Sequence, residues 1–271
     1  MNVSMQKERI SRKADDSDVL DHAVRVGLVS YGVVHLLIAW LAVQLAFGDR
    51  SGKASSSGAL HQLAESGLGQ ASLYVVAGGF AALLVWQAIE AAVGHRDEDG
   101  GKRTWKRLVS GIKVVIYAAL GVSALKVATG SSSKGGTDTW TAKLMAAPGG
   151  AVLVSIVGVG IIVAGGFLVW RGWKEKFRSK LDVQGNTGKD GRAYIWFGKA
   201  GYIAKGVALG IVGALFLYAG LTHDPYQSGG LDSALTKLLD QPFGVPLLVV
   251  MAAGIACYGL FCFAWARHLD R

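Results

Sequence analysis

Six apolar stretches of about 20 residues alternate with short polar segments along the whole chain. A helix of about 20 apolar residues rises roughly 30 Å, which matches the hydrocarbon thickness of a bilayer. The pattern therefore predicts an all-α integral membrane protein with six transmembrane helices. The predicted spans are Val26–Phe47, Ala71–Val93, Leu108–Thr129, Ala151–Trp170, Ala200–Leu221 and Val245–Ala266.

Basic residues divide the connecting segments into two classes. Of the 28 Lys and Arg residues, 20 lie before the first span, between spans two and three, between spans four and five, and after the sixth, whereas the opposite loops carry five. Segments rich in Lys and Arg stay in the cytoplasm, so both termini are predicted to be cytoplasmic, at the plasma membrane. The net charge of +9 is then an orientation signal, with anionic lipid headgroups as contacts, rather than a sign of nucleic-acid binding.

The six spans form three copies of one two-helix unit. The segment that begins Arg25-Val-Gly27 matches the one that begins Lys199-Ala-Gly201, and Arg107 opens a more diverged middle copy. Because each copy crosses the membrane twice, all three share one orientation, which predicts pseudo-threefold symmetry about the membrane normal. The predicted organisation is a polar arm at 1–23, repeats at 24–94, 107–173 and 197–271, and cytoplasmic linkers at 95–106 and 174–196.

The external connections repeat as well. Each has a Gly/Ser-rich entry, a short amphipathic stretch and a breaker, and Ala59-Leu60 in the first matches Ala234-Leu235 in the third. Each is predicted to hold a short interfacial helix on the outer surface. A side-chain oxygen can accept from the free N–H groups at a helix start, which predicts three equivalent N-caps: Ser57, Asp138 and Asp232.

Two passages carry a resemblance to a known family. Residues 201–207 follow the pattern Gly-Tyr-x-x-[Lys/Arg]-Gly-Val, and residues 234–247 follow Ala-Leu-x-x-Leu…Pro-x-Gly-x-x-Leu. Over residues 20 to 267 the chain resembles the uncharacterised bacterial membrane family catalogued as domain of unknown function 1206. The resemblance implies three tandem two-helix copies in a bacterial membrane, and it implies no activity. The second copy departs from the family pattern at Val114, where Gly is usual, and at Trp140-Thr141, which replaces Ala-Leu.

Polar side chains recur on the first helix of each copy. His35 lies four residues after Tyr31, so both occupy one helix face, and the matching pairs are Lys113/Tyr117 and Lys205/Leu209. An ionisable residue inside a span is a functional-site hypothesis by default. The predicted polar face, towards the cytoplasmic half, could receive an anionic solute or carry protons. The alternative is that His35 stays neutral and bonds a neighbouring helix while the lysines reach the headgroups. The face comprises Tyr31, His35, Lys113, Tyr117 and Lys205.

Two other sets have simpler interpretations. Basic residues at the cytoplasmic entry of each copy are predicted to contact phosphate headgroups, with a substrate-gathering ring as the alternative: Arg25, Arg107 and Lys199. Small residues that recur every four positions are predicted to let a neighbouring helix approach closely: Gly206, Gly210 and Ala214.

The sequence contains no recognisable acid–base pair, metal-ligand cluster or nucleotide motif, so no enzymatic activity, cofactor or metal is expected. Two functions remain open. The first is a non-enzymatic scaffold, accessory subunit or envelope component, which acts on a protein partner through helix faces and charged loops. The alternative is a small-solute transporter or channel, with a polar pathway in the cytoplasmic half formed by helices one, three and five.

Overall fold

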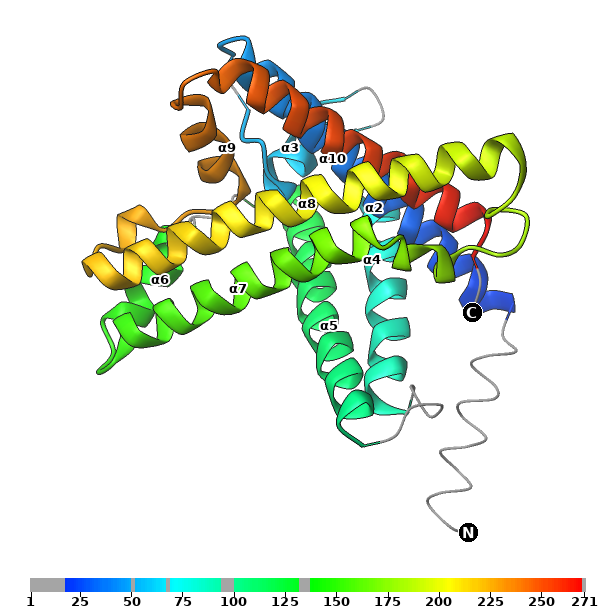
Figure 1. The fold of residues 1–271 in the computed structure, drawn as a ribbon, viewed down its shortest axis with the longest axis horizontal. Helices are drawn as coiled ribbons and strands as arrows, with labels where there is room; N and C mark the ends of the chain where they lie inside the picture. Colours follow the sequence, from blue (N-terminus) through cyan, green and yellow to red (C-terminus); the bar gives the residue numbers. More distant parts are fainter. Residues whose placement is uncertain (1–17, 50–51, 67–68, 94–99, 132–136, 270–271) are drawn as a thin grey trace.

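The computed structural model describes residues 18–49, 52–66, 69–93, 100–131 and 137–269. In these ranges it is helical, apart from an isolated bridge between Leu181 and Leu269. Six of the helices are long and apolar enough to cross a membrane, and each contains one predicted span to within a residue at its end. This confirms the predicted fold class of a six-span membrane protein (Figure 1). They are α2 (Asp18–Ala46), α4 (Gly69–Ala92), α5 (Gly100–Ala128), α7 (Gly150–Trp173), α8 (Gly188–Thr222) and α10 (Gly244–Arg267).

Three helices begin before their apolar spans. α2, α5 and α8 each start at least eight residues earlier than predicted, because the helical backbone hydrogen bonding continues through the more polar residues that precede the apolar part. Most Lys and Arg residues gather where these helices start and where α4, α7 and α10 end. We call these the basic ends of the helices, and the opposite ends, which carry the short external helices, the cap ends.

Each external connection holds a short helix, as predicted. These are α3 (Ser56–Glu65), α6 (Thr137–Met145) and α9 (Leu231–Leu239), and two 3₁₀ turns complete the chain, η1 (Lys176–Lys180) and η2 (Pro225–Gln227). The amphipathic stretches therefore form helices, with Leu60 and Leu235 fully buried on their inner sides.

The predicted N-caps are wrong for two of these helices. α3 is capped by Ser55, whose side chain accepts from the backbone N–H of Gly58, and Ser57 lies inside the helix. In α9 the cap position is Gly230, so Asp232 is already helical. Its carboxylate instead accepts from the N–H of Ala54 at 2.7 Å, which ties the third external connection to the first. Asp138 lies inside α6, and its side chain is outside the described part of the structure.

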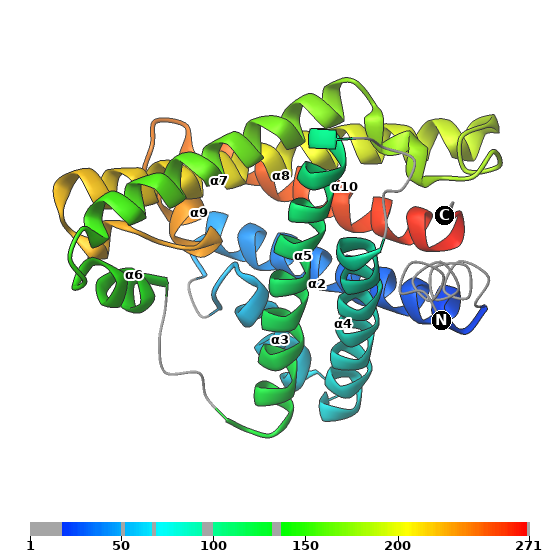
Figure 2. The ribbon, with the colours of Figure 1, turned by 90° about the horizontal axis from the view of Figure 1, so that it is seen from below.

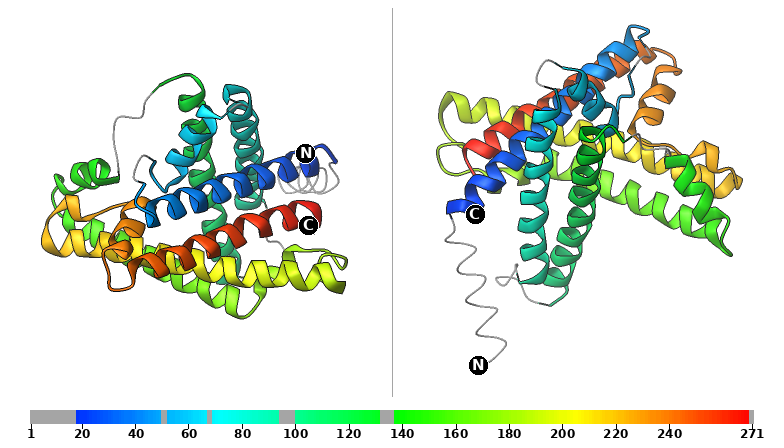
Figure 3. Two further views of the ribbon diagram at one scale, coloured as in Figure 1. Left: turned by 90° about the horizontal axis from the view of Figure 1, so that it is seen from above. Right: turned by 180° about the vertical axis from the view of Figure 1, so that it is seen from behind.

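The long helices associate as three antiparallel pairs, α4 with α5, α7 with α8, and α10 with α2 (Figures 1 and 3). The second helix of each repeat thus packs against the first helix of the next repeat, and the last helix closes on the first. Within a repeat, α2 packs on α4 and α8 on α10, whereas α5 and α7 are not among the packed pairs. The α4/α5 pair runs across the α7/α8 pair (Figures 1 and 2). The threefold axis of the sequence repeat remains a prediction.

Glycines spaced seven residues apart join α7 to α8. A Cβ atom at Gly206 would lie 2.6 Å from the carbonyl oxygen of Gly165, and one at Gly213 would lie 2.8 Å from that of Gly158. Seven residues make about two helical turns, so these positions share one face. A Cβ at Gly210 would meet open space, and Ala214 is exposed. Gly206 therefore belongs to a seven-residue seam, and the backbone of Gly210 also lies against Gly165, while close approach at Ala214 remains a prediction.

Candidate functional site

The predicted polar face comes together in part. The Lys205 ammonium of α8 donates to the Tyr31 hydroxyl of α2 at 2.7 Å and lies 3.3 Å from Nε2 of His35. The ring of Tyr31 meets the ring of Tyr117 from α5 edge-on, with 5.8 Å between centroids. Helices α2, α5 and α8, which are the first helices of the three repeats, therefore converge through these four side chains.

The hydrogen bonds of His35 assign its tautomer. Nδ1 lies 2.8 Å from the carbonyl oxygen of Tyr31, which can only accept, so Nδ1 carries the proton. Nε2 is then free to accept from the Lys205 ammonium on the neighbouring helix. His35 is neutral in this arrangement, and Lys205 supplies the positive charge of the cluster.

Aromatic rings surround that charge. The Lys205 Nζ atom lies 4.0 Å from the ring centroid of Tyr258 on α10 and 4.7 Å from that of Tyr31. A ring face attracts a cation, which partly replaces the carboxylate that a buried lysine would otherwise need. Tyr258 was not predicted, because nothing in the sequence of α10 indicates that it meets α8.

A second lysine sits in a neighbouring aromatic cage. Lys180 of η1 donates to the hydroxyl of Tyr202 at 2.8 Å, and its Nζ lies 3.6 Å from the ring of Trp265. Tyr202 precedes Lys205 by three residues on α8 and contacts Tyr258, with 5.3 Å between ring centroids. That three-residue spacing could have placed Tyr202 on the predicted face. The two cages together form what we call the basic–aromatic cluster: Tyr31, His35, Lys180, Tyr202, Lys205 and Tyr258.

Positive charge dominates this region. Burial lowers the pKa of the Lys180 ammonium well below its ordinary range, and the nearby charges of Arg171, Lys113 and Lys205 lower it further. Lys113, from the predicted face, thus lies on the Lys180 side of the region. In the described part of the chain, no carboxylate comes within 4 Å of Lys180 or Lys205. Ammonium and phenol groups without a nearby acid can donate hydrogen bonds to an anion.

The predicted headgroup residues have partners inside the protein. Arg25 donates to the carbonyl oxygen of Arg267 at 3.4 Å, and Arg107 donates to that of Ala92 at 3.0 Å. Lys199 pairs at 3.4 Å with Glu175, just beyond the end of α7. Arg25 and Arg107 therefore lie at the C-terminal end of the helix paired with their own, where the helix dipole favours a cation. Their contact with phosphate headgroups remains a prediction.

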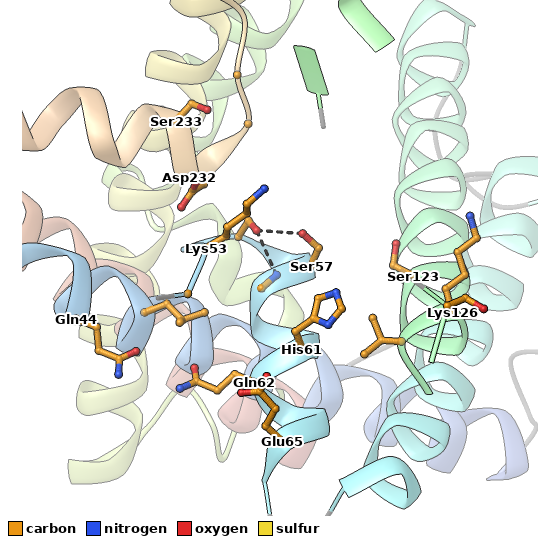
Figure 4. A pocket seen from close by; sticks show the side chains of 18 of the residues that line it. Gln44, Lys53, Ser57, His61, Gln62, Glu65, Ser123, Lys126, Asp232 and Ser233 are labelled. Carbon is orange, nitrogen blue, oxygen red and sulfur yellow. Dashed lines mark hydrogen bonds between the residues drawn. The ribbon is translucent and has the colours of Figure 1, made fainter. Parts of the chain in front are cut away.

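A polar cavity of about 1050 Å³ opens at the cap ends. Figure 4 shows His61 of α3 on one side and Ser123 and Lys126 of α5 on the other. Asp232 and Ser233 of α9 also line it. The walls come from segments far apart in the sequence, so no local pattern predicted the cavity.

The cavity shares two helices, α2 and α5, with the predicted polar face. On α2, the cavity begins at Leu41, six residues after His35. On α5 it begins at Ser123, six residues after Tyr117. Six residues rise about 9 Å along a helix, so the two polar regions are separated by about 9 Å along each of these helices.

Comparison with known proteins identifies the repeats. The family model described as Domain of Unknown Function (DUF1206) matches residues 26–94, 110–175 and 200–268. The chain is also 28% identical over 243 residues to the Uncharacterized protein YxxB of Bacillus subtilis (strain 168), which covers 88% of this chain and 86% of that protein. No solved structure matches the chain.

Proposed function

From the premise that the chain belongs to the DUF1206 family, whose name assigns no activity, we propose that this multi-pass membrane protein is a small-solute transporter. It acts without catalysing a reaction. It lies in the bacterial plasma membrane with its basic ends and both termini in the cytoplasm, as the distribution of Lys and Arg favours.

One observation carries the proposal. The cavity at the cap ends and the predicted polar face both lie along α2 and α5, about 9 Å apart on each helix. A transporter needs polar surface at more than one depth, closed by an apolar layer that can rearrange. Ile38, which lies between His35 and Leu41 on α2, and Phe80, whose ring contacts Tyr31 and Tyr117, are buried beside the two regions and would form that layer.

The charge of the cluster indicates the class of solute. Lys180 and Lys205 present ammonium groups, and Tyr31 and Tyr202 present hydroxyl groups. These groups favour a small anion over a cation, because a cation would meet like charge at close range. The solute would enter the cavity and reach the cluster when the apolar layer opens.

The scaffold interpretation remains the rival. It would explain the many apolar helix faces but would leave the cavity and the inward-facing lysines without a role. The two proposals differ in one measurable respect, since only a transporter moves a solute when it is alone in a membrane.

The decisive experiment is reconstitution of the purified chain in liposomes on a solid-supported electrode. Jumps in chloride, phosphate and acetate concentration should give a transient current for at least one of these anions. The Lys205→Met variant should lose it, whereas Lys174→Gln should keep it, because Lys174 is exposed at the basic end of α7. If the folded wild-type protein gives no transient current with chloride, phosphate or acetate, the anion-transport proposal is overturned.

A labelling experiment tests the direction of the cavity. A membrane-impermeant maleimide applied to intact cells should modify Ser123→Cys, which lines the cavity, but not Ala124→Cys, which replaces a fully buried residue. Modification of Ser123→Cys only after the cells are broken would reverse the proposed orientation.

A further inference from the structure

The gap between α5 and α7 is an unusual feature of the helix arrangement. These two helices are consecutive along the chain, yet they are not a packed pair. In a strongly apolar 18-residue stretch of each of these helices only 17% of the residues are buried, against 56% for the corresponding stretches of α2 and α10. Both helices therefore present apolar side chains outwards: Ile112, Val115 and Ile116 on α5, and Val163, Phe167 and Trp170 on α7.

Cations from both helices stand near the basic end of this gap. Arg171 lies in the last turn of α7, and its guanidinium carbon is 5.9 Å from the ring centroid of Tyr202. Lys180, from η1, lies 5.6 Å from the same ring. Lys113 of α5 is close enough to add its charge to theirs.

Acidic residues balance only part of this charge. The carboxylate of Glu90 on α4 attracts Lys113. For Arg171 and Lys180, no carboxylate lies within 4 Å among the described residues. The Nε atom of Arg171 is moreover buried without a hydrogen-bond partner in the part of the chain that the structure describes. Buried donors and unbalanced cations are costly, and an anion at this point would satisfy both.

We propose that one anionic phospholipid occupies the gap, with its phosphate on Arg171 and Lys180 and its acyl chains along the exposed faces of α5 and α7. Lys113 adds to the attraction from the other wall. A lipid suits this place better than a free anion because the cations adjoin apolar helix faces that need cover in the membrane. The proposed lipid site shares Lys180 with the basic–aromatic cluster, and otherwise it rests on Arg171 and on the exposed faces of α5 and α7.

The experiment measures lipid retention by native mass spectrometry of the full chain. The purified protein is released from nanodiscs of phosphatidylglycerol or of phosphatidylcholine with the same acyl chains. The wild-type protein should retain one phosphatidylglycerol and no phosphatidylcholine. The Arg171→Gln/Lys180→Gln double variant should bind phosphatidylglycerol about 30-fold more weakly, because each basic residue near an anionic headgroup contributes about 1 kcal/mol.

Two control variants separate the site from overall charge and from misfolding. Lys174→Gln/Lys189→Gln removes the same charge from exposed positions and should retain the lipid. Lys180→Arg keeps the charge and should also retain it. The proposal would be overturned if the wild-type protein retained phosphatidylcholine as well as it retains phosphatidylglycerol. It would also be overturned if Lys174→Gln/Lys189→Gln lost as much lipid as Arg171→Gln/Lys180→Gln.

A final arm distinguishes the source of the phosphate. Inorganic phosphate at millimolar concentration should leave phosphatidylglycerol bound and should not raise the melting temperature of the delipidated protein. Displacement of the lipid by phosphate, or equal stabilisation by both, would assign the site to a soluble anion and overturn the lipid proposal. Lipid retention and melting temperature are measured separately from the transport current. A wild-type protein that gives no current can therefore still retain the lipid, and the two proposals can fail separately.

Discussion

Repeats one and three carry glycine at a position on the first helix where repeat two carries valine. In repeat one, a Cβ at Gly27 would lie 2.6 Å from the carbonyl oxygen of Gly79, and in repeat three, a Cβ at Gly201 would lie 2.5 Å from the Cα of Tyr258. Both glycines thus let the two helices of their own repeat touch. The equivalent residue of repeat two is Val109, and there α5 and α7 do not pack. Where this residue is glycine, the two helices of the repeat pack against each other, and we call the repeat closed. Where it is valine, the two helices are not a packed pair, and we call the repeat open.

The difference has a consequence for what each repeat contributes. Closed repeats supply α2, α8 and α10, which hold the Lys205 cage. The open repeat supplies the exposed faces and the cations beside the gap. The copies of the unit therefore differ in what they contribute. The closed repeats pack inside the protein, whereas the open repeat exposes helix faces to the surrounding membrane, and the difference accompanies a local change in side-chain volume.

The largest effect should follow from giving repeat three the residue of repeat two. Gly201→Val would drive a branched side chain into the backbone of Tyr258, which cannot move without shifting α10. We expect a loss of about 3 kcal/mol in the free energy of unfolding. Unfolding of the purified protein in mixed micelles measures it. The reciprocal change, Val109→Gly, should cost about 0.5 kcal/mol, mostly through helix propensity. Similar losses in the two variants would contradict the comparison.

The seam between α7 and α8 offers a second test. A Cβ at Gly213 would lie 2.7 Å from the backbone nitrogen of Ile162, so Gly213→Ala should destabilise the protein by about 2 kcal/mol. Gly210→Ala is the matched control, because a Cβ there meets open space. It should be neutral or stabilising by up to about 1 kcal/mol. Melting temperatures in one detergent decide between the seven-residue and the four-residue seam.

The tie between repeats one and three at the cap ends should have a smaller effect. Asp232→Ala leaves the N–H of the fully buried Ala54 without its acceptor. An unpaired buried donor costs about 1–2 kcal/mol, and we expect the melting temperature to fall accordingly. Asp240→Ala, at the exposed end of α9, should change it little. An unchanged melting temperature for Asp232→Ala would show that the tie is replaced by water.

The smallest difference concerns two tyrosines of the predicted polar face. Tyr31→Phe removes a hydroxyl that accepts from Lys205 and should cost about 1 kcal/mol. Tyr117 meets Tyr31 only through its ring, so Tyr117→Phe should leave stability nearly unchanged. Calorimetry of both variants at one pH makes the comparison. An equal cost for both would mean that the Tyr117 hydroxyl has a partner as strong as Lys205.

Part of the site followed from repeat alignment. Tyr31, His35, Tyr117 and Lys205 were predicted to converge because equivalent positions in three copies face the same way if the copies surround one axis. Lys180 was not predicted, because it lies in a linker whose charged composition is typical of a solvated hinge. Tyr258 was missed because its role depends on which helix α10 packs against, and local spacing does not contain that information.

The sequence alone determined the number of crossings, their boundaries at the cap ends, the threefold repetition and the two classes of loop. Length, hydropathy and charge act on each segment separately, and the bilayer applies the same requirements to every helix. Only the tertiary structure decided which helices pair, which glycines form the seam, and where Arg171 and Lys180 meet. These outcomes depend on side-chain volume at contacts between distant segments, where a single residue such as Val109 or Gly201 sets how closely two helices approach.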